Sequence, residues 1–389
     1  MESFVGRSFD IIALKEQRKK QLVIILIVAV CTVIVAAAGF GIYHWYINRH
    51  FSDYEVTDSI TIKNGASLEY VACEDGVIRY GRDGITAINR KGEDIWGGSY
   101  EMANPKLDVC KNSAVVADVG GTSLYVYRGK DTGVDLTVDY PIVSACISEQ
   151  GVVAVLTEES SSNTIEIYNP FAKTNKLLVE IPTNVEEGYP VSVDISPDGK
   201  SVVAAYLCIT TGAAQSRVAF YNFTDVGKNA NCLVGARNYD NTVIADVEFL
   251  DEDHVCLFGE KGFYLWENMK QPKMVKKREL SETIQSAFID ETHVGLILEK
   301  GDDKSQLRLY GLSGEEALKL TIESGYTSAQ IVGDEILLNS DEKCAIYRTN
   351  GVKKYASELK SRISYFFKGN SRNAYMFIQN SKIKLAKLK

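Results

Sequence analysis

The stretch Tyr189-Pro-Val-Ser-Val-Asp-Ile-Ser-Pro-Asp-Gly-Lys-Ser-Val-Val-Ala-Ala-Tyr-Leu207 decides the fold class of this chain. An alternating run leads into a turn, and a run rich in β-branched residues follows it. Pro197 presets φ for the first turn position, Asp198 can bond its own backbone, and Gly199 tolerates a positive φ. A short aromatic strand, Arg217-Val-Ala-Phe-Tyr-Asn222, comes after a loop. The stretch therefore predicts three successive antiparallel strands.

The end of that third strand recurs along the chain and gives the period of the fold. Two or three apolar residues precede an aromatic residue or a polar break, at Ile88, Tyr127, Tyr168, Tyr221, Trp266, Tyr310, Tyr347 and Ala386. The intervals of 39, 41, 53, 45, 44, 37 and 39 residues are close to the roughly 40–45 residues of a four-stranded propeller blade. The longest interval contains the polar insertion 210–216, and we expect residues 206–217 to form an exposed contact loop.

The ends of the repeat array indicate how it closes. Continuous apolar runs such as Val202–Tyr206 and Val294–Leu298 are typical of strands buried on both faces. The last repeat lacks a fourth strand, which the isolated strand 54–62 could supply, and such closure would remove an exposed sheet edge. The sequence therefore predicts an all-β propeller of eight blades, or of seven if the first copy is partial. Outside the N-terminal apolar segment, 269–280 is the likeliest helix, and its basic residues Lys273, Lys276, Lys277 and Arg278 suit a solvated strand face better than a binding patch.

A long apolar segment precedes the repeats. From Leu22 to Tyr43 the only clearly polar side chain before the aromatic end is Thr32, and about 20 apolar residues span a bilayer core. Basic residues flank the near end and aromatic residues the far end, so the positive-inside rule places the N-terminus in the cytoplasm. The expected organisation is a cytoplasmic tail (1–20), a transmembrane helix (21–47), a connector with the closing strand (48–62) and an extracytoplasmic propeller (63–389). A cleaved signal peptide is the alternative, and it exports the same domain.

Charge and cysteine content limit the possible partners. The formal net charge is −8, and residues 51–389 hold 37 basic and 48 acidic residues, a net charge of −11. An acidic domain argues against a nucleic-acid partner. Seven of the eight cysteines lie outside the apolar segment, and an odd number without close pairs is a poor disulfide framework. Buried free thiols are the simpler interpretation.

The residues that usually carry catalysis or bind metals are scarce. Of four histidines, His254 and His293 open the second strands of successive repeats, where a role in capping a turn is the simplest interpretation. A calcium site at Asp251 and Asp253 lacks the remaining ligands of a proper loop. No zinc-protease, nucleophile-elbow or Cys-x-x-Cys motif is present. We therefore assign no catalytic, cofactor-binding or metal-binding residue and expect no cofactor.

The aromatic ends of the third strands allow two interpretations. If the repeats close into a ring, Tyr127, Tyr168, Tyr221, Trp266, Tyr310 and Tyr347 form a ring-like set. They could line a face that binds a peptide or glycan, or they could fill the wedges between blades. We favour packing between blades.

Two motifs resemble known propeller families. Asp194-Ile-Ser-Pro-Asp-Gly-Lys200 resembles the strand–turn element of WD40-like and YVTN-type propellers, and Ile85-Thr-Ala-Ile-Asn-Arg-Lys-Gly-Glu-Asp-Ile-Trp96 resembles a repeat of the quinoprotein (PQQ-like) propellers. As a whole, the chain is similar to uncharacterised bacterial membrane-anchored propeller proteins. The resemblance implies fold rather than activity. Trp96 has no counterpart in most later repeats, so the quinone cofactor is not carried over.

Two functions from different classes fit these observations. A non-catalytic platform that binds a protein or a cell-envelope component needs no concentrated chemistry and is favoured. A propeller enzyme, such as a lyase or hydrolase of envelope glycans, would gather charged groups from several blades in the central channel. A receptor that signals inward is limited by a tail of about 20 residues, which is too short for a catalytic domain.

Overall fold

In the computed structural model the chain divides into two compact units, Met1–His50 and Phe51–Lys389. The structure describes residues 2–62, 68–129, 132–160, 162–183, 188–210, 213–228, 231–240, 242–359, 361–379 and 382–389.

The first unit is a single helix, α1 (Glu2–Ile47). Its part Lys19–Ile47 contains an 18-residue stretch with a mean hydropathy of 3.1, whose side chains are exposed. By length and composition this part suffices to cross a membrane, and an N-terminal signal sequence would satisfy the same criteria. The region before residue 20 belongs to the same helix, since α1 is already helical from Glu2.

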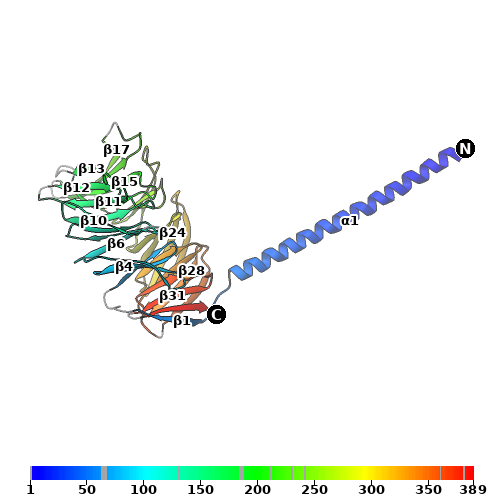
Figure 1. Cartoon of the computed structure of the whole chain (residues 1–389). Helices are drawn as coiled ribbons and strands as arrows, with labels where there is room; N and C mark the ends of the chain where they lie inside the picture. The colour runs from blue at the N-terminus through cyan, green and yellow to red at the C-terminus, as the bar shows by residue number, and fades with distance from the viewer. Residues whose placement is uncertain are drawn as a thin grey trace. The chain divides into compact units, whose positions relative to one another are not determined.

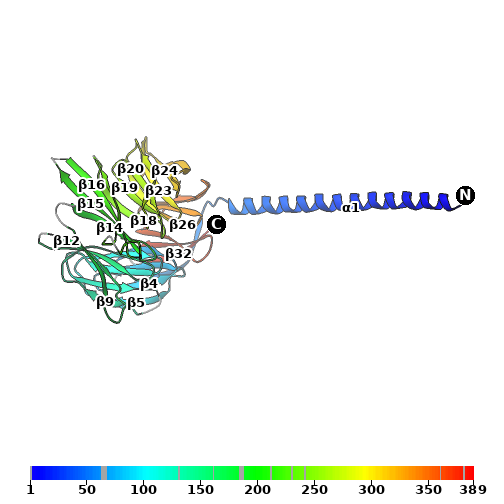
Figure 2. The same ribbon diagram turned by 90° about the horizontal axis from the view of Figure 1, so that it is seen from above.

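The second unit is an eight-bladed β-propeller in which each blade is a four-stranded antiparallel sheet (Figures 1 and 2). Blades 1 to 4 contain β2 (Glu69–Cys73), β3 (Gly76–Gly81), β4 (Gly84–Asn89) and β5 (Asp94–Ser99); β6 (Pro105–Cys110), β7 (Ser113–Asp118), β8 (Ser123–Tyr127) and β9 (Val134–Thr137); β10 (Ile142–Ile147), β11 (Val153–Glu158), β12 (Asn163–Tyr168) and β13 (Leu177–Thr183); and β14 (Tyr189–Ile195), β15 (Ser201–Thr210), β16 (Ala213–Asn222) and β17 (Leu233–Tyr239).

The remaining blades follow the same order until the last, which takes its fourth strand from the start of the unit. Blades 5 to 8 contain β18 (Ile244–Phe249), β19 (Val255–Gly259), β20 (Gly262–Glu267) and β21 (Lys273–Glu279); β22 (Ile284–Ile289), β23 (His293–Gly301), β24 (Lys304–Gly311) and β25 (Glu316–Glu323); β26 (Ser328–Val332), β27 (Glu335–Asn339), β28 (Lys343–Arg348) and β29 (Lys353–Glu358); and β30 (Tyr365–Lys368), β31 (Ala374–Gln379), β32 (Lys382–Leu388) and β1 (Tyr54–Thr61).

Strand β1 closes the ring. It pairs antiparallel with β32, from Tyr54 opposite Leu388 to Thr61 opposite Lys382, and lies beside the C-terminal strands in Figure 1. The sequence-based expectation of eight blades closed by residues 54–62 is thus confirmed, and the seven-bladed alternative is wrong. Closure of this kind joins the two ends of the propeller through backbone hydrogen bonds.

The core consists of eight apolar clusters, each between one blade and the next around the ring. The aromatic ends of the third strands lie within these clusters. Tyr127, Tyr168, Tyr221, Trp266 and Tyr310 are buried, and Tyr347 packs against the cluster between blades 6 and 7. Their interpretation as packing between blades, rather than as an aromatic binding face, is therefore confirmed.

The expectation of a loop at residues 206–217 is wrong. β15 continues to Thr210 and β16 begins at Ala213, so these residues form the outer part of a long β-hairpin. Residues 211 and 212, at its tip, lie outside the described residues. The cross-strand pairs from Tyr206 opposite Arg217 to Thr210 opposite Ala213 continue the antiparallel ladder of the hairpin.

Of the two expectations for segment 269–280, the helix is wrong and the solvated strand face is confirmed. The segment forms no helix, because β21 (Lys273–Glu279) is the fourth strand of blade 5 and pairs with β20. Lys273, Lys276 and Lys277 are exposed, as expected for the solvated face of an outer strand.

Candidate functional site

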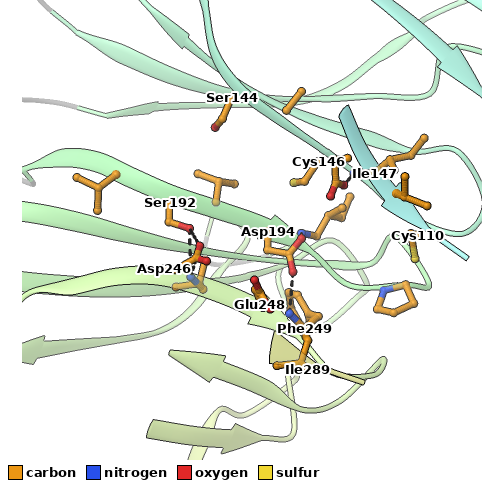
Figure 3. Close-up of a pocket in the computed structure, with 18 residues that line it drawn as sticks. Cys110, Ser144, Cys146, Ile147, Ser192, Asp194, Asp246, Glu248, Phe249 and Ile289 are labelled. Atoms are coloured by element: carbon orange, nitrogen blue, oxygen red, sulfur yellow. Dashed lines mark hydrogen bonds between the residues drawn. The ribbon is translucent and has the colours of Figure 1, made fainter. Parts of the chain in front are cut away.

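The first strands of the blades line the central channel, and a pocket of about 540 Å³ opens among those of blades 2 to 6. Its walls come from β6, β10, β14 and β18, with Ile289 of β22 (Figure 3). Four of the 18 lining residues are acidic, and none is Lys, Arg or His: the acids are Asp108, Asp194, Asp246 and Glu248. The channel wall is therefore acidic on this side.

The register places the acids at matching positions. Four first-strand residues occupy equivalent positions in their blades: Asp108, Cys146, Asp194 and Glu248. Each is paired with a second-strand residue, and that residue is paired with the third-strand residue just before the aromatic end. Blades 2, 4 and 5 thus carry a carboxyl group, and blade 3 a thiol, at one level of the channel. Asp246 lies two residues before Glu248 on β18, so it shares the channel-facing side of that strand.

Three of these carboxylates link first strands of neighbouring blades. Asp108 accepts a hydrogen bond at 2.8 Å from the backbone N–H of Ile147, and Asp194 accepts one at 2.7 Å from Phe249. Asp246 accepts a hydrogen bond at 2.7 Å from the Ser192 hydroxyl. Figure 3 shows the links at Asp194 and Asp246. Such hydrogen bonds fix the spacing of the strands and orient the acids toward the pocket.

The four acidic side chains border the channel, and each keeps part of its surface exposed. Protein nevertheless surrounds them on most sides. Burial raises the pKa of Asp108 to about 6. Burial, aided by the charge of Asp108, holds the pKa of Asp194 well above its usual range. Burial and the neighbouring Asp246 raise the pKa of Glu248 to about 8. Removing the carboxylates from water and placing like charges together both favour the protonated forms.

One end of the channel is crossed by an ion pair. Lys111, in the turn after β6, lies 3.1 Å from Glu149 of blade 3 and 3.7 Å from Glu291 of blade 6. Blades 2 and 6 stand opposite each other in a ring of eight, so this lysine reaches across the channel. The starts of the first strands, where Val191 and Asp246 line the pocket, are at the other end. We therefore regard that second end as the mouth of the pocket.

The histidines singled out from the sequence lie in turns. The Asp251 carboxylate accepts the backbone N–H of His254 at 2.7 Å and lies 2.9 Å from its ring Nδ1. Asp290 accepts the backbone N–H of His293 at 2.6 Å. Each contact is local to its own turn. Among the described residues, no group of three or more His, Cys, Asp or Glu side chains is arranged to hold a metal ion.

The acids of the channel were not predicted from the sequence, because each lies singly within a strand rather than in an acidic cluster. The signal that could have found them is alternation within the first strands, as in Val193-Asp-Ile195 and Asp246-Val-Glu248. When a strand is followed by one that is buried on both faces, a polar residue within the first strand indicates that this strand lines a lumen rather than the core. Aligning the third-strand ends would have brought these positions to one level.

The raised pKa values predict a pH-dependent stability. The folded propeller holds protons on Glu248 up to a pKa of about 8 and on Asp108 up to about 6, whereas in the unfolded chain these groups release them near pH 4. The folded state thus binds more protons in this window, so the free energy of unfolding falls as pH rises from about 4 to 8. We expect Glu248→Gln, which removes one titrating group at nearly constant shape, to flatten this fall.

The measurement is the thermal unfolding midpoint at closely spaced pH values. Glu252→Gln is the matched control, since Glu252 is exposed in the turn after β18. The control should follow the wild-type curve. A Glu248→Gln curve that coincides with the wild type over the whole window would show that Glu248 is ionised in the folded protein.

These features define a class of protein: an eight-bladed propeller with an acidic channel pocket, preceded by one long apolar helix. The chain belongs to DUF5711, a family of unknown function, whose match covers residues 47–388. The match includes the whole propeller and its closing strand. A search of curated proteins finds no match.

Solved structures share the fold at low sequence identity. BamB from Moraxella catarrhalis is 14% identical, covers 86% of this chain and 100% of its own, and superposes with a TM-score of 0.52. Sqt1 from Chaetomium thermophilum, solved bound to the N-terminus of the ribosomal protein L10, is 10% identical, covers 86% of this chain and 95% of its own, and has a TM-score of 0.51. At such identities the similarity concerns the fold alone.

Proposed function

We propose that this protein is a membrane-tethered, non-catalytic interaction platform that binds a positively charged segment of a partner protein in its channel pocket. The observation that carries the proposal is the lining of that pocket, with four acids and no basic side chain among its 18 residues. A bound cation would favour the ionised form of these carboxyl groups, because it would offset the burial and mutual repulsion that raise their pKa values in the empty pocket. The wall also offers apolar contact through Val191, Val193 and Phe249.

The tether would be the apolar part of α1, with the N-terminus in the cytoplasm and the propeller outside. Lys15, Arg18, Lys19 and Lys20 precede the apolar stretch, and Tyr43, Trp45 and Tyr46 end it. This distribution is the one that the positive-inside rule and the aromatic belt favour. The partner is then expected to be a membrane or envelope protein.

The solved neighbours are compatible with such a role. The Sqt1 structure contains the N-terminus of another protein, so a propeller of similar fold holds a protein terminus in that case. Propellers commonly use a rigid ring of blades to present loops and channel ends to partners. For this chain, the support comes from the charge of its own channel.

A second candidate function is an acid–base enzyme in the same pocket. The carboxyl groups of Glu248 and Asp108, whose pKa values are raised to about 8 and 6, have the property expected of a general acid at neutral pH. Against this role, the oxygens of Asp108, Asp194 and Asp246 already accept hydrogen bonds that join neighbouring blades. Hydrolysis of envelope glycans that Glu248→Gln abolishes would favour the enzyme over the platform.

The platform is tested by site-specific photocrosslinking of the full-length protein in intact cells. A photoreactive residue replaces Val191, which is 43% exposed at the pocket mouth, or Leu178, which is 52% exposed on outer strand β13 of blade 3. We expect one crosslinked partner from position 191 and none from position 178. Adding Asp246→Asn and Glu248→Gln should abolish the crosslink. A partner captured equally from both positions, or unaffected by the loss of the acids, would contradict the proposal.

A further inference from the structure

The hairpin of β15 and β16 extends beyond the strands on either side of it. β14 stops pairing at Tyr189, opposite Leu207, and β17 stops at Tyr239, opposite Ser216. The hairpin continues to Thr210 and Ala213. Within the described residues of blade 4, the outer part of this hairpin therefore has no strand paired to either edge.

One face of this extension carries large apolar side chains. Tyr189 and Leu207 lie directly opposite each other, and Ile209 follows Leu207 by two residues, so all three point to the same side of the sheet. Tyr189 is 57% exposed and Ile209 is 71% exposed. We call these three residues the hairpin face. Large apolar residues exposed together are uncommon unless they bind something.

The hairpin face looks toward blade 5 and the channel mouth. On the same side of β15, Val203 and Ala205 pack in the cluster between blades 4 and 5. Ser216, opposite Leu207, accepts the backbone N–H of Ile244 at 2.9 Å, where β18 begins. The hairpin face thus rises beyond the start of β18, the strand that carries Asp246 and Glu248.

The hairpin face is continuous with the acidic pocket. Val191, two residues after Tyr189, lines the pocket. Ser192, the next residue, donates its hydroxyl hydrogen to Asp246. An extended chain rises about 3.3 Å per residue, so a segment of a few residues can touch both surfaces.

We propose that the hairpin face and the acidic pocket form one docking surface for an extended segment of a partner protein that carries basic residues flanked by large apolar ones. This inference rests on the proposed function and specifies the chemistry of the partner. The charge of the pocket selects the basic residues. The hairpin face buries the apolar residues of the partner. Shortening the side chains of the hairpin face should therefore weaken binding strongly, as it does for residues at the centres of other protein interfaces.

The test uses the full-length protein in detergent and a fluorescein-labelled peptide with central Arg-Arg flanked on each side by Leu-Thr-Leu. Binding is followed by fluorescence anisotropy. We expect Tyr189→Ser with Ile209→Ser to weaken binding at least tenfold, and Leu178→Ser, at a residue on blade 3 that is 52% exposed, to leave it unchanged. A peptide with serine in place of each leucine should bind the wild type as weakly as the parent peptide binds the double variant.

The outcomes separate this inference from the proposed function. If Asp246→Asn with Glu248→Gln weakens binding but the change of Tyr189 and Ile209 does not, the inference is wrong and the acidic pocket remains the site. If the parent peptide fails to bind at millimolar concentration, the inference is wrong, and crosslinking from position 191 decides the proposed function alone. Thermal melts identical to the wild type establish that each variant is folded.

Discussion

Replacing Glu335 by alanine is expected to destabilise the propeller by about 3–5 kcal/mol, the usual cost of removing one partner from a buried ion pair. Glu335 begins β27 and has no exposed surface. Its carboxylate accepts hydrogen bonds at 2.5 Å from Lys354, 2.5 Å from Lys368 and 2.7 Å from the Tyr375 hydroxyl. These donors come from β29, β30 and β31, so the carboxylate joins blade 7 to blade 8.

The cost arises because two lysines would lose their counter-charge inside the protein. Burial acts to raise the pKa of Glu335, but the charges of Lys368 and Lys354 hold it below its ordinary value. Burial lowers the pKa of Lys354 to about 8 despite its hydrogen bond to Glu335. Without the carboxylate, both ammonium groups would remain enclosed with the backbone carbonyl of Arg372 as an acceptor.

Urea unfolding of the full-length protein measures this effect. The control is Glu342→Ala, also in blade 7, where Glu342 and Arg362 form an ion pair with both side chains more than 70% exposed. An exposed pair contributes about 0–1 kcal/mol. Equal effects of the two substitutions would show that the network around Glu335 is solvated in solution.

The second large effect is expected at the seam that closes the ring, which is β1 paired with β32 together with Ile62 just after β1. Ile62, directly after β1, is 6% exposed and packs with Phe367, Met376 and Ile383 of blade 8 and with blade 1. Ile62→Ala should cost about 2–4 kcal/mol, the loss of transfer free energy plus a cavity. Val56→Ala, in the same closing strand but 43% exposed, should cost less than about 1 kcal/mol.

The same unfolding experiment distinguishes the two positions. Fluorescence and circular dichroism should give one coincident transition for the Ile62 variant, shifted to lower urea. If Ile62→Ala unfolds no earlier than Val56→Ala, then the seam adds nothing to the stability of the ring. Separate transitions would mean that the last blade opens before the others.

The blade count could be predicted from the sequence because six of the eight third strands end in an aromatic side chain that packs between neighbouring blades. The eight ends from Ile88 to Ala386 all lie at matching positions, opposite second-strand residues such as Val77, Ala114 and Tyr375. The closing strand could also be predicted, because the repeat array has one extra strand before the first blade and lacks the fourth strand of the last blade.

The features that the sequence did not predict include contacts between residues of different blades. Residues 206–217 looked like a polar insertion because strand pairing within a hairpin does not require apolar side chains. Glu335 pairs with Lys354 and Lys368, which lie 19 and 33 positions away in the sequence. No local sequence pattern predicts contacts over such separations. The acids of the channel are similar, because each lies in an ordinary strand and only the ring brings them together.

The seam also has a mechanical meaning. Only three residues, 48–50, separate Ile47 at the end of α1 from Phe51, which is buried between blades 7 and 8 and donates its backbone N–H to the carbonyl of Lys354 at 2.8 Å. Any tension that reaches the propeller from the helix must therefore enter at Phe51 and pass into the ladder of β1 and β32. A pull along β1 loads its hydrogen bonds together, whereas a sideways pull breaks them one by one from Tyr54 and Leu388. Under load, this ladder within blade 8 would yield first and shield the other blades from force.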